Sequence, residues 1–186
     1  GVPEKHKRDW LSELKAAALL NVQHISAYHL TVEKKTALNY QINKEKTVMP
    51  DHESSIVEYQ QLKSVINNFG YFQYEISNFC LKGYESKHNS SYWKNTNYMG
   101  IGPSAHSYDL KKRRWNISNN HLYIKAIKMK EPFYEEEILT PTDLANEQIL
   151  VGTRSIYGFS IQKVEKYLNE DQKKMFRYQL SILIDE

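Results

Sequence analysis

The sequence predicts an α/β fold followed by a mainly helical C-terminal part, and two observations support that prediction. In residues 1–76 an amphipathic helical pattern and an apolar strand pattern follow one another twice. Beyond residue 108 the patterns are mostly helical. Alternation of helix and strand at this spacing is typical of parallel βα units, in which ligand sites collect beyond the carboxyl ends of the strands.

The first helix is predicted over residues 7–20, where Trp10 and Leu14 begin an apolar stripe with the spacing of a buried helix face. A strand is predicted over 24–32, because its apolar and β-branched residues suit a pleated, mostly buried setting. The polar stretch 33–49 has no clear period.

A second helix is predicted to begin at Pro50 and Asp51, since proline suits the first helical turn and aspartate caps it. Gly70 is a natural stop for this helix, and a second strand follows over 71–76. Two strands cannot close a sheet by themselves. We therefore expect the chain to be a piece of a larger protein, with further strands before Gly1.

The C-terminal part is predicted as a short strand over 113–117 and a series of helices. Thr140, Pro141 and Asp143 form the start signal of a helix that should end near Gly158. The other predicted helices are 119–130, 161–169 with Ser160 as its cap, and one that begins near Asp171.

Composition excludes several classes of protein. Among 186 residues, 40% are hydrophobic, which excludes a disordered chain. The 25 basic and 22 acidic residues leave a net charge of +3, too balanced to indicate nucleic-acid binding. No apolar run reaches the roughly 18 residues that span a bilayer, so we expect a cytoplasmic protein with no integral membrane segment. The single cysteine excludes an internal disulfide and a multi-thiolate metal site.

The segment "ESKHNSSYWKNTNYMGIGPSAHSY" (85–108) contains the densest set of candidate ligands and is predicted as neither helix nor strand. Its motif His88-Asn89-Ser90-Ser91-Tyr92-Trp93 supplies an imidazole and two flat rings, which suit a haem or another metal macrocycle. The alternative is a structural loop in which Asn and Ser cap the backbone and the rings plug the core.

The second half of that segment places Gly100 and Gly102 two residues apart. Glycines allow close backbone approach, and free N–H groups there could bind a carboxylate or phosphate. The motif lacks the lysine of a Walker loop and the third glycine of a dinucleotide fingerprint. A tight turn is the alternative.

Polar residues also lie on or at the ends of the two predicted strands, with Tyr28 and His29 on the first and Glu75, Ser77 and Asn78 at the end of the second. Ends of βα strands suit ligand-orienting groups, although Glu75 could instead pair with a barrel Lys or Arg.

The lone Cys80 is expected to be a small buried apolar residue. The helical tail 142–168 could be mistaken for a winged-helix element, but its basic density is low for nucleic-acid binding.

The motifs "HISAYHLTVE", "YEISNFC", "KHNSSYW", "YMGIGPSAHSY", "RRWNI" and "NEQILVGTRSIYG", in this order and spacing, resemble one family. It is the oxygen-independent coproporphyrinogen III oxidase-like radical SAM family, in its haem-chaperone (HemW) branch. The resemblance implies the C-terminal part of a partial (β/α)6 radical SAM barrel over residues 1–112. A mainly helical C-terminal domain would occupy residues 113–186.

The resemblance also implies ligands and partners. The full-length protein would carry S-adenosylmethionine and a [4Fe-4S] cluster, bind haem and deliver it to haem-requiring client proteins, touching a membrane only through a client. Coproporphyrinogen III oxidase activity is the alternative. The implied haem-site residues are His88, Asn89, Tyr92 and Trp93. The residues implied to approach S-adenosylmethionine are Tyr28, His29, Glu75, Ala105 and His106.

The sequence departs from the family pattern in two places. The family holds its cluster with three cysteines, and this chain has one, so we expect it to hold no cluster and to be inactive by itself. Ser86 stands where many relatives have cysteine. That replacement leaves His88 as the candidate ligand of the haem iron.

Overall fold

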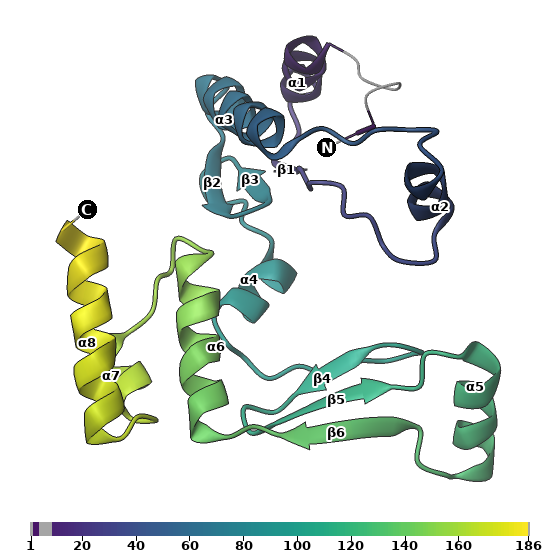
Figure 1. The fold of residues 1–186 in the computed structure, drawn as a ribbon, viewed down its shortest axis with the longest axis vertical. Helices are drawn as coiled ribbons and strands as arrows, with labels where there is room; N and C mark the ends of the chain where they lie inside the picture. The colour runs from purple at the N-terminus through teal and green to yellow at the C-terminus, as the bar shows by residue number, and fades with distance from the viewer. Residues whose placement is uncertain (1, 4–8, 186) are drawn as a thin grey trace. The chain divides into compact units, whose positions relative to one another are not determined.

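A computed structural model describes residues 2–3 and 9–185 of the chain. Contacts divide the chain into two compact units, Gly1–Ser86 and Lys87–Glu186. Figure 1 shows the elements of each unit. Among the residues that the structure describes, no helix is long and apolar enough to cross a bilayer.

The first unit combines helices with a three-stranded sheet (Figure 1). Its strand order is β1-β3-β2, and β3 is antiparallel to both of its neighbours. The elements are α1 (Trp10–Leu19), β1 (His24–Ser26), α2 (Ala37–Asn43), α3 (His52–Asn68), β2 (Phe72–Glu75) and β3 (Asn78–Cys80).

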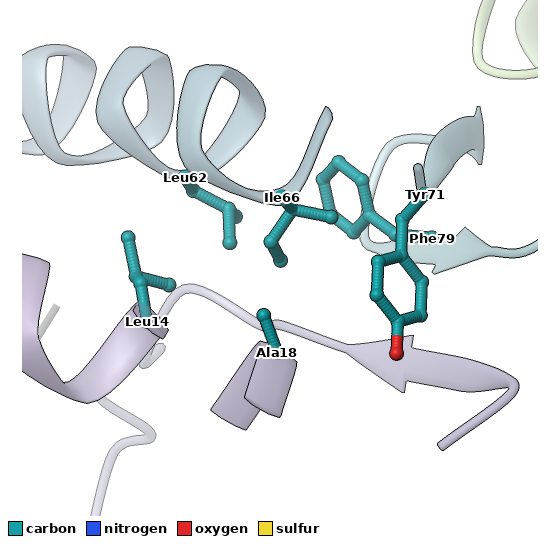
Figure 2. Close-up of a cluster of buried hydrophobic side chains, with 6 residues drawn as sticks. All are labelled: Leu14, Ala18, Leu62, Ile66, Tyr71 and Phe79. Carbon is teal, nitrogen blue, oxygen red and sulfur yellow. The ribbon is translucent and has the colours of Figure 1, made fainter. Parts of the chain in front are cut away.

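The core of this unit lies between α1, α3 and the sheet. Leu62 and Ile66 of α3 point toward Leu14 and Ala18 of α1 (Figure 2). Each pair is four residues apart and therefore lies on one helix face. Phe79 of β3 joins the same cluster. α3 starts where the sequence predicts, because the side chain of Asp51 accepts an N–H group of its first turn. α1 begins at Trp10, after its cap Asp9, which is later than predicted, and residues 7 and 8 of the prediction lie outside the described residues.

Several predictions for this unit were wrong in detail. The first strand ends at Ser26, so Tyr28 and His29 lie outside it. The two predicted strands run in the same direction but do not pair with each other, because the chain reverses after Glu75 and the unpredicted strand β3 lies between them, antiparallel to both. The stretch 33–49 contains the helix α2, which has no buried residue and so leaves no apolar period in the sequence.

The second unit contains an antiparallel sheet of order β4-β5-β6. The strand predicted at 113–117 and the helix predicted at 119–130 are confirmed as β5 (Lys112–Asn116) and α5 (Asn120–Met129). Neither β4 (His106–Tyr108) nor β6 (Tyr134–Ile138) was predicted. All five residues of β6 are exposed, so it lacks the alternation of a half-buried strand.

Cross-strand ion pairs join β5 to β6. Glu136 accepts from Lys112 at 2.9 Å and from Arg114 at 2.8 Å. Each of the three consecutive glutamates of β6 accepts a hydrogen bond from a side chain of β5. These cross-strand bonds explain why the acidic run forms a strand. β4 ends before residue 112, β5 begins at it, and the two strands pair within one unit. The domain boundary at residue 112 stays a prediction.

Four further helices complete this unit, namely α4 (Lys87–Trp93), α6 (Pro141–Thr153), α7 (Ile161–Glu165) and α8 (Glu170–Asp185). The predicted start of α6 is confirmed, with Thr140 and Asp143 bonded reciprocally as a capping box. That helix ends at Thr153, five residues earlier than expected. Ser160 caps α7 as predicted, by accepting the N–H of Lys163.

Candidate functional site

The segment 87–93, predicted to be irregular, is the short helix α4. Asn95 ends it in the left-handed conformation, at φ 53°. The N–H of Asn95 bonds the carbonyl of Tyr92, and the N–H of Thr96 bonds that of Ser91. These two bonds make a Schellman motif, in which asparagine replaces the usual glycine. The helix is therefore specified by its C-terminal end.

One side of α4 presents His88 and Tyr92 to solvent. Their rings meet edge to face at 5.1 Å between centroids, and the His88 Nε2 lies 3.3 Å from the Tyr92 hydroxyl. Tyr92 meets Tyr98 edge to face at 4.7 Å, and Tyr98 lies 6.0 Å from Tyr108. We call these four side chains the aromatic row.

The aromatic row runs from an exposed end to a buried one. Tyr92 is 39% exposed, whereas Tyr108 is 5% exposed. Burial raises the pKa of Tyr98 and of Tyr108 above the ordinary value of tyrosine. Both phenols therefore remain neutral at physiological pH, and at its exposed end the row offers the flat ring of Tyr92 beside one imidazole. This chemistry suits a planar aromatic ligand with a metal centre.

The opposite side of α4 is anchored. Ser90 is buried, and its hydroxyl shares a hydrogen bond of 3.0 Å with the hydroxyl of Tyr157. The ammonium group of Lys94 lies 4.7 Å from the centre of the Tyr157 ring. Asn89 and Trp93 are half-buried. Of the haem-site candidates, the structure brings His88 and Tyr92 into direct contact.

The glycine motif forms a closed turn. The N–H of Gly100 donates to the Ser107 hydroxyl at 2.9 Å, and the amide of buried Asn116 donates to the Gly102 carbonyl at 2.9 Å. A Cβ at Gly100 would overlap the backbone of His106. The geometry thus favours the tight-turn alternative for Gly100. Next to the turn, Ala105 is half-buried, and His106 is exposed on β4, paired in register with Trp115.

The first unit holds the other candidates in a small polar network around Asn78. Glu75 is 4% exposed, and its carboxylate accepts the N–H of Ser77 at 3.1 Å and the amide of Asn78. The Asn78 amide also reaches the Tyr28 hydroxyl at 3.5 Å, while its carbonyl oxygen accepts from Ser26. Glu75 is thereby held within its own hairpin. His29 is exposed beside Tyr28.

The residues do not fit an iron–sulfur cluster. Cys80 is fully buried, and burial raises the pKa of its thiol to about 11, with Glu85 adding to the shift. Within residues 2–3 and 9–185, no group of three or more His, Cys, Asp or Glu side chains could hold a metal ion. No reaction step through a cluster can be assigned to this chain.

Sequence reasoning missed Tyr98, Tyr108 and Tyr157. Tyr98 and Tyr108 are joined by two backbone hydrogen bonds of 2.9 Å across the glycine turn. A hairpin interpretation of residues 98–108 would have placed these two rings together. No local signal links Tyr157 to Ser90, since 67 residues separate them.

No family model matches the chain. It is 30% identical over 167 residues to heme chaperone HemW of Lactococcus lactis, covering 90% of this chain and 44% of the relative. It is 33% identical over 169 residues to heme chaperone HemW of Bacillus subtilis, covering 90% of this chain and 45% of the relative. The chain thus spans less than half the length of these curated relatives.

One solved structure shares the fold. It is the coproporphyrinogen III oxidase HemN of Escherichia coli, described as a radical SAM enzyme. The TM-score is 0.69 at 15% identity, over 89% of this chain and 41% of that one. Together with the sequence relatives, this match confirms the expected resemblance. The chain belongs to the oxygen-independent coproporphyrinogen III oxidase-like radical SAM family and corresponds to the C-terminal part of its HemW branch.

Proposed function

We propose that this chain forms the haem-binding part of a radical SAM haem chaperone, which carries haem and passes it to client proteins. The observation that supports it best is the exposed His88–Tyr92 pair at the open end of the aromatic row. The names of the HemW relatives agree with this proposal.

In this proposal His88 supplies the bond to the haem iron, since neutral imidazole is a good ligand for it. Its Nε2 must release the Tyr92 hydroxyl, 3.3 Å away, before it can coordinate. Tyr92 then offers its ring to the macrocycle, with Asn89 and Trp93 flanking the pair on the same helix.

Exposure of the pair suits a carrier. A haem held through one side chain on an open helix face remains accessible to the ligands of a second protein. Transfer then requires exchange of one axial bond rather than the opening of a pocket. An exposed site therefore agrees better with haem delivery than with permanent retention.

The remaining cofactors would belong to the complete protein. We propose that its [4Fe-4S] cluster is held by residues outside this chain. Tyr28, His29, Glu75, Ala105 and His106 would be the contributions of this chain toward S-adenosylmethionine. We also propose a cytoplasmic location and haem-requiring clients as partners.

Titration of the chain with hemin tests the haem proposal. We expect a Soret band on binding, and His88→Ala should shift that band and weaken binding. His121→Ala is the matched control, because His121 is also an exposed helical histidine of the second unit. The proposal fails if the chain does not bind hemin, or if His88→Ala binds it like the parent chain with the same spectrum.

A transfer assay tests the chaperone role. The loaded chain is mixed with a haem-free haem protein, and the absorbance spectrum of the acceptor is followed. Transfer faster than spontaneous release of hemin supports delivery. Transfer at the rate of spontaneous release contradicts it.

A further inference from the structure

We infer that Tyr157 is a positioning residue for the α4 haem site, a role that rests on the proposed function. Tyr157 lies in the turn between α6 and α7, 64 residues after Trp93 in the chain. It belongs to the motif "GTRSIYG", to which the proposed function gives no role.

Tyr157 holds α4 through two groups on one side of that helix. Its hydroxyl bonds Ser90 at 3.0 Å, and its ring lies under the ammonium of Lys94 at 4.7 Å. Ser90 and Lys94 are one helical turn apart, so both contacts fix the same face.

The two sides of α4 therefore have different roles. At 3.6 residues per turn, Ser90 lies about 160° around the helix from both His88 and Tyr92. The Tyr157 contact thus secures the side of α4 that faces away from the iron-ligand candidate. On the other side, Tyr92 meets Tyr98 at 4.7 Å. The helix is held between Tyr157 and the aromatic row.

Backbone packing fixes the position of the turn that carries Tyr157. Gly152, in the last turn of α6, has room for no side chain. A Cβ there would lie 2.6 Å from the Phe159 Cβ and 2.7 Å from the Gly158 carbonyl carbon. Gly158 adopts φ 62°, which favours glycine. Phe159 then contacts Phe176 of α8 at 6.3 Å between ring centroids.

Loss of the Tyr157 hydroxyl should loosen α4 without removing a haem contact. Ser90 would be left buried with no partner for its hydroxyl, which disfavours the docked position of the helix. His88 and Tyr92 would then spend less time aligned with Tyr98. Tyr157 would thus change haem affinity by changing the fraction of molecules in which α4 is aligned.

Hemin titration of four variants of the full chain tests the inference: Tyr157→Phe, Ser90→Ala, the double variant, and Tyr178→Phe as control. Tyr178 is 64% exposed on α8. Tyr157→Phe should weaken hemin binding by roughly 2- to 10-fold, the range for one net hydrogen bond. The double variant should be no weaker than the weaker single variant, because both remove the same bond. Tyr178→Phe should match the parent chain.

The outcomes separate this inference from the proposed function. If His88→Ala alters hemin binding and Tyr157→Phe does not, the site stands and the positioning role is overturned. If the chain binds no hemin, the proposed function fails. In that case, hydrogen exchange without ligand still measures how firmly Tyr157 holds α4.

The exchange measurement follows the amides of Lys94, Asn95 and Thr96, whose N–H groups bond carbonyls of α4. Tyr157→Phe should speed their exchange relative to Tyr178→Phe, at an unchanged melting temperature. Equal exchange rates in the two variants overturn the inference.

Discussion

The imidazole Nε2 of His88 lies 3.3 Å from the hydroxyl of Tyr92, one helical turn further along α4. This nitrogen is therefore already in contact with a phenol. Any metal that binds this nitrogen must displace that contact, and this competition can be measured.

Tyr92→Phe tests the competition. The variant keeps the ring and removes only the hydroxyl, so His88 no longer has a hydrogen bond to break. We expect hemin to bind roughly 2- to 10-fold more tightly, the equivalent of one net hydrogen bond. Hemin titration measures the change, with Tyr178→Phe as control. Loss of binding would instead assign the iron to the Tyr92 phenolate.

Gly100→Ala should destabilise the second unit. The added Cβ would overlap the backbone of His106, which cannot move without disturbing β4. Overpacking of this kind costs about 1–3 kcal/mol. Gly158→Ala is the comparison, since it has open space around the new Cβ and only an unfavourable φ of 62°. Urea denaturation of both variants should rank Gly100→Ala as the less stable, and the reverse order would contradict the account of the glycine turn.

Glu136 should contribute stability that disappears in acid. Hydrogen bonds from Lys112 and then Arg114 hold its pKa below the ordinary value of 4.5. A carboxyl with a lowered pKa in the folded state stabilises the fold above its unfolded pKa, and this contribution is lost as the pH falls through the folded pKa. The effect is small because the pair is exposed.

Glu136→Gln provides the measurement. Denaturation midpoints at pH 7 and below pH 4 should differ less in the variant than in the parent chain. Glu131→Gln, at an exposed carboxylate outside this network, should keep the pH dependence of the parent. If Glu136→Gln keeps the pH dependence of the parent chain, the ion pairs do not stabilise the pairing of β5 with β6.

Cys80 should make the first unit less stable in alkali. Burial is the main reason that its pKa rises from 9.0 to about 11. A raised pKa gives stability that is complete below the unfolded value and is lost as the pH rises through the folded value. The free energy of unfolding should therefore fall between pH 9 and about 11.

The comparison is with Cys80→Ala, which retains all other alkaline titrations of the chain. The parent chain should lose more stability than this variant between pH 8 and 10.5. Thiol labelling of the folded parent chain at pH 8 should also be slow, because the sulfur is buried and protonated. Rapid labelling would contradict the burial of Cys80.

The sequence predicts the elements that have strong local signals. Asp51 and Gly70 mark the two ends of α3, and Thr140 with Asp143 marks the start of α6. In each case the signal is a side chain that bonds the backbone of its own turn, or a glycine that tolerates positive φ. Such signals need no knowledge of the rest of the fold.

Elements without local signals were missed. β6 is stabilised by ion pairs to a strand about 20 residues earlier, and α2 buries none of its residues. The irregular interpretation of segment 87–93 failed because Asn95, rather than glycine, ends α4. The candidate His88 was found from residue chemistry and family resemblance. The contacts that hold its helix, Tyr92 with Tyr98 and Ser90 with Tyr157, depend on residues that are not adjacent in the sequence.

The two-sided construction of α4 has a consequence for variation. His88 and Tyr92 are exposed, while Ser90 and the Schellman end at Asn95 keep the helix in place. Substitutions at the exposed pair can therefore change which ligand is bound without dismantling the support beneath it. Under the proposed function, a protein engineer could therefore alter ligand preference at the exposed pair alone, whereas a change in the support would alter stability and binding together.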